Sequence, residues 1–304
     1  MNEKKYIKII EKMNADYQDL LISNNYIAGK NLNRTKELIK KGKILTILNK
    51  TKNRIIYKKI NCFSNRPNDF KTNNNYTENN DKKIVIYSCV TGNYDNIVEP
   101  LFKIDNVDYF LFTDNEKANG KIWNKEPIEE KFLQSNNILT NRYLKFHPNK
   151  LFKDKYDYSI YIDGNIQVIG DITELIYSIN PKTGLSIHRH AERDSIYNEG
   201  RFCILNKKGN KQYIKEQLKK YKMEGMPEHY GLLECSIIVT DLKNENAKII
   251  YDNFWNEFIA SRTMRDQLIF PYILWKMNYK IDDVGSLGNN EYRDPKFKFI
   301  KHNN

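Results

Sequence analysis

The chain has 304 residues, 40% of them hydrophobic, which is enough for one large α/β domain and a smaller appendage. It contains no run of eighteen apolar residues, and its start, MNEKKYIKIIEK, lacks the apolar stretch and cleavage site of a secretory signal, so we expect a cytoplasmic protein. The net charge is +12, and residues 1–60 hold 15 Lys and Arg against 5 Asp and Glu, so most of the excess lies in this first segment.

Residues 3–22 and 33–48 place apolar side chains at helical spacing among many lysines. This pattern predicts a basic, helical N-terminal arm over residues 1–62. Residues 63–82 are polar, contain a proline and hold almost no apolar side chains, which is typical of a linker. We therefore place the main domain at residues 83–304.

The main domain begins with alternating strand-like and helix-like segments. The strand candidates are KIVIYSCV, DYFLFTD, YDYSIYI, GLSIHRH and LLECSIIVTDL. Apolar side chains recur at helical spacing in residues 128–147, 245–260 and 265–277. Such alternation predicts an α/β fold with a mainly parallel sheet covered by helices.

The four cysteines are Cys62, Cys89, Cys203 and Cys235. Three of them lie in apolar, strand-like segments, where a small buried thiol packs well. Their scattered positions indicate neither a disulfide framework nor a zinc motif.

Asp163 directly follows the strand candidate YSIYI, and Asn165 lies two residues further on. Ligands of open α/β sheets collect at the carboxyl ends of strands, and Gly164 permits their close approach. A carboxylate and an amide oxygen are hard ligands that suit Mg²⁺ or Mn²⁺, which commonly bridge to substrate phosphates. The alternative is a simple β-turn, which Asp, Gly and Asn all favour.

Two groups of basic residues lie near strand candidates. Arg142 and Lys145 share one helical face that could meet a diphosphate, although a solvated face is equally compatible with their spacing. His188, His190 and Arg193 follow a strand, and we predict that they bind acceptor or phosphate, because the sequence shows too few further ligands for a structural zinc. A plain surface strand end is the alternative.

Five segments, in order, resemble a known family: YSCVTGNYD, NRYLKFHPNKLF, YSIYIDGNIQVIGDI, GLLECSIIV and SRTMRDQLIFPY. This is the plant and bacterial glycosyltransferase-like family related to the turgor-regulation-defect and mucilage-related proteins. The resemblance implies a glycosyltransferase-A (GT-A) fold, with a Rossmann-like, nucleotide-sugar-binding mixed sheet flanked by helices. It also implies an Asp-x-Asp type motif that binds metal and donor. Here the motif is Asp163-Gly164-Asn165, which lacks the second carboxylate.

The resemblance also assigns roles to residues at both ends of the domain. The nucleotide base and ribose would lie against the residues that follow the first strand, namely Thr91, Gly92, Tyr94 and Asp95. A tight turn is the ordinary alternative there. Some GT-A enzymes bring a C-terminal histidine to the metal, which implies His302 here; a frayed terminus is the alternative.

Glu234 and Asp266 match family motifs and are candidates for acceptor binding or a general base. Arg265 and Gln267, beside Asp266, are then expected to contact sugar. The alternative for Asp266 is a capping interaction with Thr263, and that for Glu234 is a partnered strand carboxylate.

Together these observations predict a glycosyltransferase that uses Mn²⁺ or Mg²⁺ and a nucleotide-sugar donor, a UDP-sugar above all. The acceptor would be a glycan or lipid-linked glycan, in bacterial surface polysaccharide synthesis, and the arm would associate with the inner face of the membrane. A catalytically silent sugar-binding relative is one alternative. A nucleic-acid-binding protein that uses the arm is another, although we expect no nucleic acid partner.

Overall fold

The computed structural model describes residues 3–63, 82–92, 97–115 and 120–301. The helices are α1 (Glu3–Ile22), α2 (Asn24–Lys40), α3 (Ile44–Ile60), α4 (Asn137–Lys145), α5 (Pro148–Phe152), α6 (Ile196–Leu205), α7 (Lys211–Met223), α8 (Glu245–Ser261) and α9 (Asp266–Lys276), with short 3₁₀ turns η1 (Glu130–Phe132), η2 (Thr173–Ser178), η3 (Ile281–Asp283) and η4 (Glu291–Arg293). The strands are β1 (Ile84–Val90), β2 (Val107–Thr113), β3 (Asn124–Glu126), β4 (Tyr158–Ile162), β5 (Ile166–Val168), β6 (Leu185–Arg189), β7 (Leu233–Asp241), β8 (Gly285–Ser286) and β9 (Phe297–Phe299).

The main sheet has the strand order β3-β2-β1-β4-β7-β6-β8, and its first four strands in that order are parallel. Strand β7 runs antiparallel to both β4 and β6. The predicted fold class, a mixed sheet flanked by helices with a helical N-terminal arm, is confirmed. The carboxyl ends of β1, β4 and β6 and the amino end of β7 consequently meet at one edge of the sheet.

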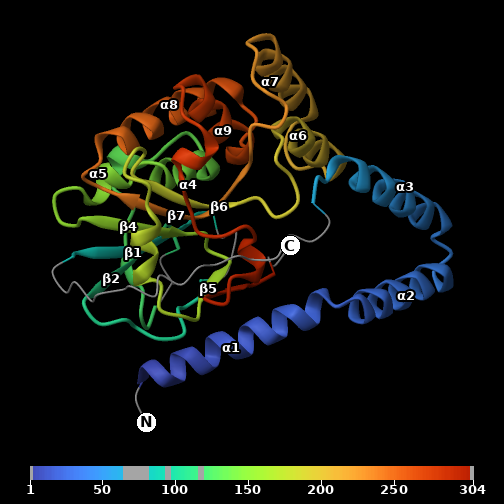
Figure 1. Cartoon of the computed structure of the whole chain (residues 1–304), viewed down its shortest axis with the longest axis horizontal. Helices are drawn as coiled ribbons and strands as arrows, with labels where there is room; N and C mark the ends of the chain where they lie inside the picture. Colours follow the sequence, from blue (N-terminus) through green and yellow to red (C-terminus); the bar gives the residue numbers. More distant parts are fainter. Residues whose placement is uncertain (1–2, 64–81, 93–96, 116–119, 302–304) are drawn as a thin grey trace.

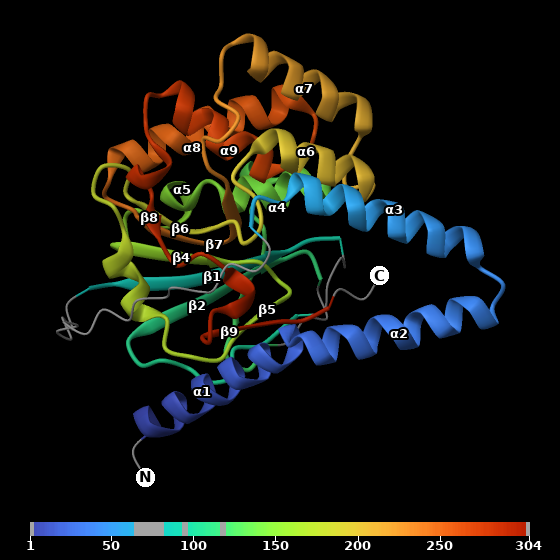
Figure 2. The same ribbon diagram turned by 45° about the vertical axis from the view of Figure 1, so that its right-hand side comes forward.

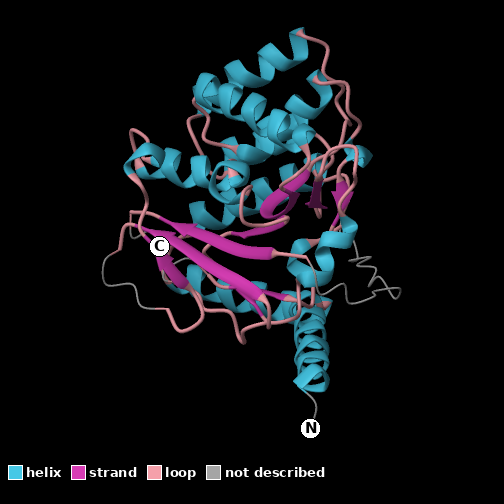
Figure 3. Cartoon of the chain, turned by 90° about the vertical axis from the view of Figure 1, so that its left-hand side faces the viewer, coloured by secondary structure: helices cyan, strands magenta, loops and turns pink. Residues whose placement is uncertain are grey.

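The sheet is buried on both faces, and neighbouring residues of β1 point to opposite sides. Val85, Tyr87 and Cys89 belong to the larger core, under the layer formed by α4 and α6–α9. Figure 3 shows a thick layer of helices over one face of the sheet. Ile84 and Ile86 belong to the smaller core on the opposite face, to which η2, β5 and β9 contribute. The burial of β1 on both faces explains its continuous apolar sequence.

The arm is a chain of three helices that contacts the α/β domain at two places (Figures 1 and 2). Asn14 and Gln18 of α1 donate hydrogen bonds to backbone carbonyls of the segment that carries β9. At the other end, α3 lies beside α6, where Tyr57 contacts Phe202. Helix α2 stands away from the domain and joins α1 to α3 (Figure 2). None of the helices in the described ranges is both long and apolar enough to span a membrane.

The structure differs from the sequence-based expectations in the arm and in the helices of the main domain. The arm pattern read as one helix over residues 33–48 is divided at Gly42, where φ is +64°, between α2 and α3. Helices α6 and α7 were not predicted, and Cys203, expected in a strand-like segment, lies in α6. The predicted linker lies almost wholly outside the described residues.

Candidate active site

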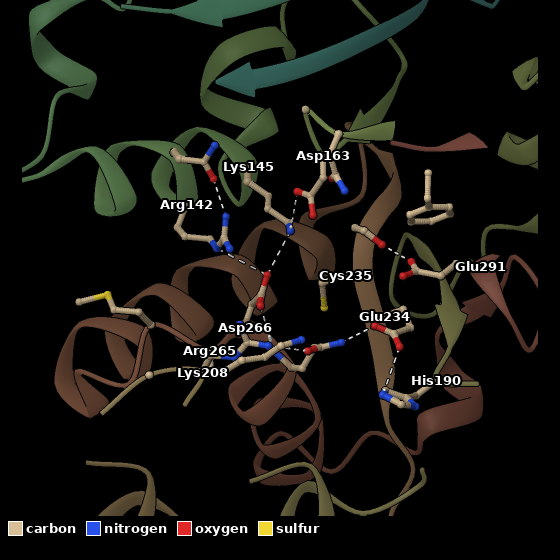
Figure 4. Close-up of a pocket in the computed structure, with 18 of the residues that line it drawn as sticks. Arg142, Lys145, Asp163, His190, Lys208, Glu234, Cys235, Arg265, Asp266 and Glu291 are labelled. Atoms are coloured by element: carbon tan, nitrogen blue, oxygen red, sulfur yellow. Dashed lines mark hydrogen bonds and ion pairs between the residues drawn. The ribbon is translucent and has the colours of Figure 1, made fainter. Parts of the chain in front are cut away.

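A pocket of about 1300 Å³ lies at the edge where β1, β4, β6 and β7 meet (Figure 4). Its walls come from the residues that follow β1, β4 and β6, from the start of β7, and from α4, α6, α9 and η4. Segments far apart in the sequence therefore contribute to one cavity. Two clusters of buried charged side chains dominate its lining.

The first is the Lys145 cluster, which consists of Arg142, Lys145, Asp163 and Asp266. Asn136 caps α4 by accepting a hydrogen bond from Leu139 N, and the last turn of this helix carries Arg142 and Lys145 into the pocket. The Lys145 side chain is only 1% exposed, and its Nζ lies 3.2 Å from Asp163 Oδ1 and 3.0 Å from Asp266 Oδ2. The predicted pairing of Arg142 and Lys145 on one pocket face is seen in the structure.

Opposite charges control ionisation in the Lys145 cluster. Burial alone would raise the pKa of Asp266, but Lys145 and Arg142 outweigh it and hold that pKa well below its ordinary value. Burial alone would lower the pKa of Lys145, and Asp163 and Asp266 reverse this and raise it. Asp266 is also the first residue of α9, where the helix dipole favours a negative charge. Both groups are therefore charged at neutral pH.

Asp163 directly follows β4, and its side chain is 29% exposed, so it can be reached from the pocket. Its Oδ1 accepts hydrogen bonds from Tyr161 Oη at 2.8 Å and from Lys145 Nζ. A Cβ on Gly164 would lie 2.4 Å from Val90 Cγ2, so glycine is required for this close contact between the ends of β4 and β1. Glycine at position 164 therefore lets the ends of β4 and β1 pack closely.

Asn165 is the second oxygen donor of the predicted metal motif. Its Nδ2 donates to the carbonyl of Ile300 at 3.3 Å, so its Oδ1 is the atom that it can offer to a cation. Asp163 and Asn165 line the same pocket. One carboxylate and one amide oxygen, completed by substrate phosphate and water, fit Mg²⁺ or Mn²⁺. His302, the predicted third ligand, lies outside the described residues.

The predicted nucleotide segment is described only in part. Thr91 and Gly92 line the pocket, and Gly92 N donates to the carboxylate of Asp114 at 2.8 and 3.0 Å. Gly92 has φ +67°, and a Cβ there would meet Asn137, so this turn needs glycine. Tyr94 and Asp95 lie outside the described residues, and their predicted contact with base and ribose stays a prediction.

The second is the Glu234 cluster, which consists of His190, Arg193, Glu199, Glu234, Gln267 and Glu291. Glu234 lies near the start of β7, where Gln267 Nε2 donates to its Oε2 and His190 Nε2 lies 3.1 Å from its Oε1 (Figure 4). His190 Nδ1 accepts hydrogen bonds from the backbone amides of Glu192 and Arg193. His190 Nε2 also lies 3.0 Å from Arg193 Nη2, so the imidazole links Arg193 and Glu234.

Carboxylates outnumber cations in the Glu234 cluster. Burial, followed by the charges of Glu291 and Glu199, raises the pKa of Glu234 well above its ordinary value, and Arg193 opposes this. Arg193 Nε also donates to Glu199 Oε2 at 2.9 Å, so the positive charge of Arg193 is shared between Glu199 and Glu234. Burial also raises the pKa of Glu291, which accepts a hydrogen bond from Ser236 Oγ. Glu234 is thus a stronger base than an ordinary glutamate.

The remaining predicted residues divide between the pocket and the core. Arg265 lines the pocket, and its guanidinium donates to Gln267 at 3.1 Å. His188 does not line it: this residue is fully buried, and its Nε2 lies 3.1 Å from Asp294 Oδ2. The prediction that His188 binds acceptor or phosphate is therefore wrong, because its side chain is enclosed in the core, whereas His190 lines the pocket.

The capping alternative for Asp266 is wrong, because Arg265 occupies the cap position and no side-chain capping hydrogen bond forms there. Glu199 and Glu291 were missed by sequence reasoning. Glu291 lies in η4, a single turn without periodicity, and no local pattern identifies it. Glu199 lies in the unpredicted α6, whose Gly200 obscures a helical pattern.

Three solved structures show partial similarity to the chain. The apo WbbM bifunctional glycosyltransferase has 14% identity, with 66% of this chain and only 38% of that chain covered and a TM-score of 0.41. Apo mouse xyloside xylosyltransferase 1 has 10% identity, with 64% and 82% covered and a TM-score of 0.40. Galactosyltransferase LgtC, in complex with donor and acceptor sugar analogues, has 13% identity, with 62% and 70% covered and a TM-score of 0.36.

No curated protein sequence matches the chain. A protein-family sequence model matches residues 55–300, a range that includes both charged clusters and every described strand. This family is described as a glycosyltransferase-like domain, which supports glycosyl transfer as the reaction class. The chain therefore belongs to the TOD1/MUCI70 family of glycosyltransferase-like domains.

Proposed function

We propose that this protein transfers a sugar from a nucleotide-sugar donor, a UDP-sugar above all, to a hydroxyl of a glycan or lipid-linked glycan. The observation that carries the proposal is the pairing of two unlike buried clusters in one pocket of the GT-A-type fold expected for the family. The Lys145 cluster holds cations for a diphosphate, and the Glu234 cluster holds a base for an acceptor. These are the two electrostatic requirements of glycosyl transfer.

On the donor side, the diphosphate lies beside Asp163 and Asn165. A Mn²⁺ or Mg²⁺ ion held by these two residues would supply Lewis-acid stabilisation of the departing diphosphate. Lys145 and Arg142 present fixed positive charges next to the same position. Because both cations are already anchored by Asp266, they need no reorganisation when negative charge develops on the leaving group.

On the acceptor side, Glu234 is the general base. The acceptor oxygen forms its bond to the anomeric carbon while the bond from that carbon to the diphosphate breaks, and Glu234 takes the acceptor proton. Asp266 is less suited to this role, because its lowered pKa makes it a weak base. We therefore assign Asp266 the task of holding Lys145 and Arg142, and His190, Arg193, Arg265 and Gln267 the contacts with acceptor.

We further propose that the arm binds an anionic membrane at its inner face, where acceptors of bacterial surface polysaccharide synthesis are made. Residues 24–60 contain eleven Lys and Arg and one Glu. Exposed aliphatic side chains lie among these cations, namely Leu32, Ile39, Ile44, Leu45 and Leu48. Each basic residue near an anionic surface contributes about 1 kcal/mol, and the aliphatic side chains add burial in the interface.

The membrane proposal is tested by sedimentation with phosphatidylserine vesicles. Binding is expected to weaken with salt and to fall in a Leu45→Asp variant, whereas Leu133→Asp, an exposed site outside the arm, is the matched control. Binding that is equal to vesicles of neutral lipid, or unchanged in Leu45→Asp, contradicts this part of the proposal.

The catalytic proposal is tested with a panel of UDP-sugars in the presence of Mn²⁺, by following release of UDP with and without acceptor glycans. Release is expected for at least one donor, and Asp163→Ala is expected to abolish it. Donor binding without any release identifies a silent sugar-binding relative, and full activity of Asp163→Ala refutes the assignment of the donor site.

A further inference from the structure

A second group of potential metal ligands lies outside the pocket. Cys62 follows α3, Asp194 lies in the loop after β6, and His229 lies between α7 and β7. Cys62 Sγ lies 2.8 Å from Asp194 Oδ1, and His229 Nδ1 lies 2.9 Å from the same oxygen. One ligand atom from each residue lies within 4.8 Å of the other two. None of the three lines the pocket.

The donor set is specific in its chemistry. A thiolate, an imidazole and a carboxylate are the ligands of Zn²⁺, with bonds of about 2.3 Å to sulfur and about 2.0–2.2 Å to nitrogen and oxygen. Such bonds in a tetrahedron place ligand atoms roughly 3.3–3.6 Å apart, so small side-chain movements suffice here. Mg²⁺ and Ca²⁺ prefer oxygen donors and leave the thiol and the imidazole unexplained. With three protein ligands, the fourth position is open to water.

The backbone around the cluster is already fixed by hydrogen bonds between the same segments. Phe63 N donates to Glu192 O at 3.1 Å, and Arg193 donates from its guanidinium to Asn61 Oδ1 at 2.7 Å. The residues on both sides of Cys62 are thus tied to the two residues that precede Asp194. On the third segment, Gly231 N donates to Asp194 O at 2.8 Å. The ligands are therefore held near one another without any metal, which favours binding.

We propose that Cys62, Asp194 and His229 bind one Zn²⁺ that fastens the end of the arm to the loop carrying His190 and Arg193. Cys62 would connect the metal to the end of α3, and Asp194 would connect it to Arg193, the preceding residue, which lines the pocket. The metal would therefore stabilise the structure and take no part in sugar transfer. This role does not depend on the proposed reaction.

The test uses the full-length protein after dialysis against a chelator. Zinc is then added back, and its stoichiometry is measured by elemental analysis and its affinity by competition with a chromophoric chelator. Co²⁺ is added to a separate metal-free sample to detect cobalt–thiolate charge-transfer absorption. We expect one tightly bound zinc per chain and a cobalt–thiolate band. Cys62→Ser and His229→Gln are each expected to weaken zinc binding at least about tenfold, and Cys62→Ser to remove the band.

Two controls separate this site from other metal binding. Cys203→Ser changes a thiol elsewhere in the fold, and Asp163→Ala removes the carboxylate of the proposed donor site; both are expected to keep the zinc and the cobalt band. The proposal is overturned if the wild-type protein binds no stoichiometric zinc, or if Cys62→Ser and His229→Gln bind it as tightly as the wild type. Neither result bears on transfer activity.

Discussion

The two clusters of the pocket both combine carboxylates with basic side chains, yet they shift carboxyl pKa values in opposite directions. In the Lys145 cluster, two cations lie against Asp163 and Asp266, and the pKa of Asp266 falls. In the Glu234 cluster, three carboxylates are close together beside one arginine and a histidine, and the pKa of Glu234 rises. Burial favours a raised pKa in both clusters, and the balance of neighbouring charge decides whether that effect is reversed.

This difference divides the chemistry. A carboxylate that stays ionised can position cations for a diphosphate, whereas a carboxylate with a raised pKa is, in its ionised form, the stronger base. Pairs of titratable groups whose environments separate their pKa values are typical of acid–base assignments in active sites. The proposed roles of Asp266 and Glu234 follow from this contrast, and four changes test it.

The largest effect is expected for Glu234→Gln. Removal of the general base should lower the rate constant of transfer by about 10²- to 10⁴-fold, with little change in the Michaelis constant for the donor. Glu192→Gln, at an exposed side chain that lines the same pocket, is the matched control and should remain near wild-type activity. Steady-state kinetics with a saturating donor measures the effect, and a loss of less than threefold in Glu234→Gln removes Glu234 as the base.

Lys145→Met tests the opposite cluster. This change leaves Asp266 buried without its closest cation, so we expect the free energy of unfolding to fall by about 3–5 kcal/mol. The double variant Lys145→Met/Asp266→Asn should regain part of that stability, because the buried carboxylate charge is removed together with its cation, but it should not regain the transfer activity lost with Lys145. Urea denaturation measures both, with Lys150→Met, an exposed lysine of α5, as the control. Equal stability of the wild type and Lys145→Met contradicts the assigned charge pairing.

Gly164→Ala tests the packing that holds Asp163 in place. The added methyl would meet Val90 Cγ2, so we expect a loss of about 1–3 kcal/mol in stability and weaker donor binding. The double variant with Val90→Ala should lose less than the sum of the two single losses, because the contact is removed. Strict additivity in thermal unfolding would show that the two residues do not touch.

The smallest effect is the dependence of transfer on pH. Since the base works only when ionised, and burial raises the pKa of Glu234, activity should fall as the pH decreases through that raised pKa, by at most tenfold per pH unit. Stability should change in the opposite sense: the protonated form favours folding, so the contribution of Glu234 declines as the pH rises from its unfolded pKa through its folded pKa. Glu234→Gln should lack both dependences, and an unchanged activity profile in this variant assigns the titration to another group.

Much of the fold could be predicted from local patterns. Continuous apolar segments in the sequence predicted β1, β2, β4, β6 and β7, because strands buried on both faces have continuous apolar sequence. Helix α7 was missed, although Ile214, Leu218 and Tyr221 recur at helical spacing and could have revealed it. The short strands β3, β5, β8 and β9 carry too few residues to show any period.

The site could be predicted only where a residue follows a recognisable element. Asp163 ends a strand, and Arg142 and Lys145 share a helical face, so their positions were within reach of the sequence. That Lys145 pairs with Asp266, 121 residues away, depends on how α4 and α9 pack. The same holds for Cys62, Asp194 and His229, whose separations match no metal motif.

The most direct test of the central claim is calorimetric titration of UDP into the wild type and Asp163→Ala, each with and without Mn²⁺. The claim is that a nucleoside diphosphate binds at the end of β4 beside Lys145. We expect Mn²⁺ to strengthen UDP binding to the wild type and Asp163→Ala to lose this enhancement. UDP affinity that is the same in both proteins under all conditions would place the diphosphate elsewhere and contradict the account.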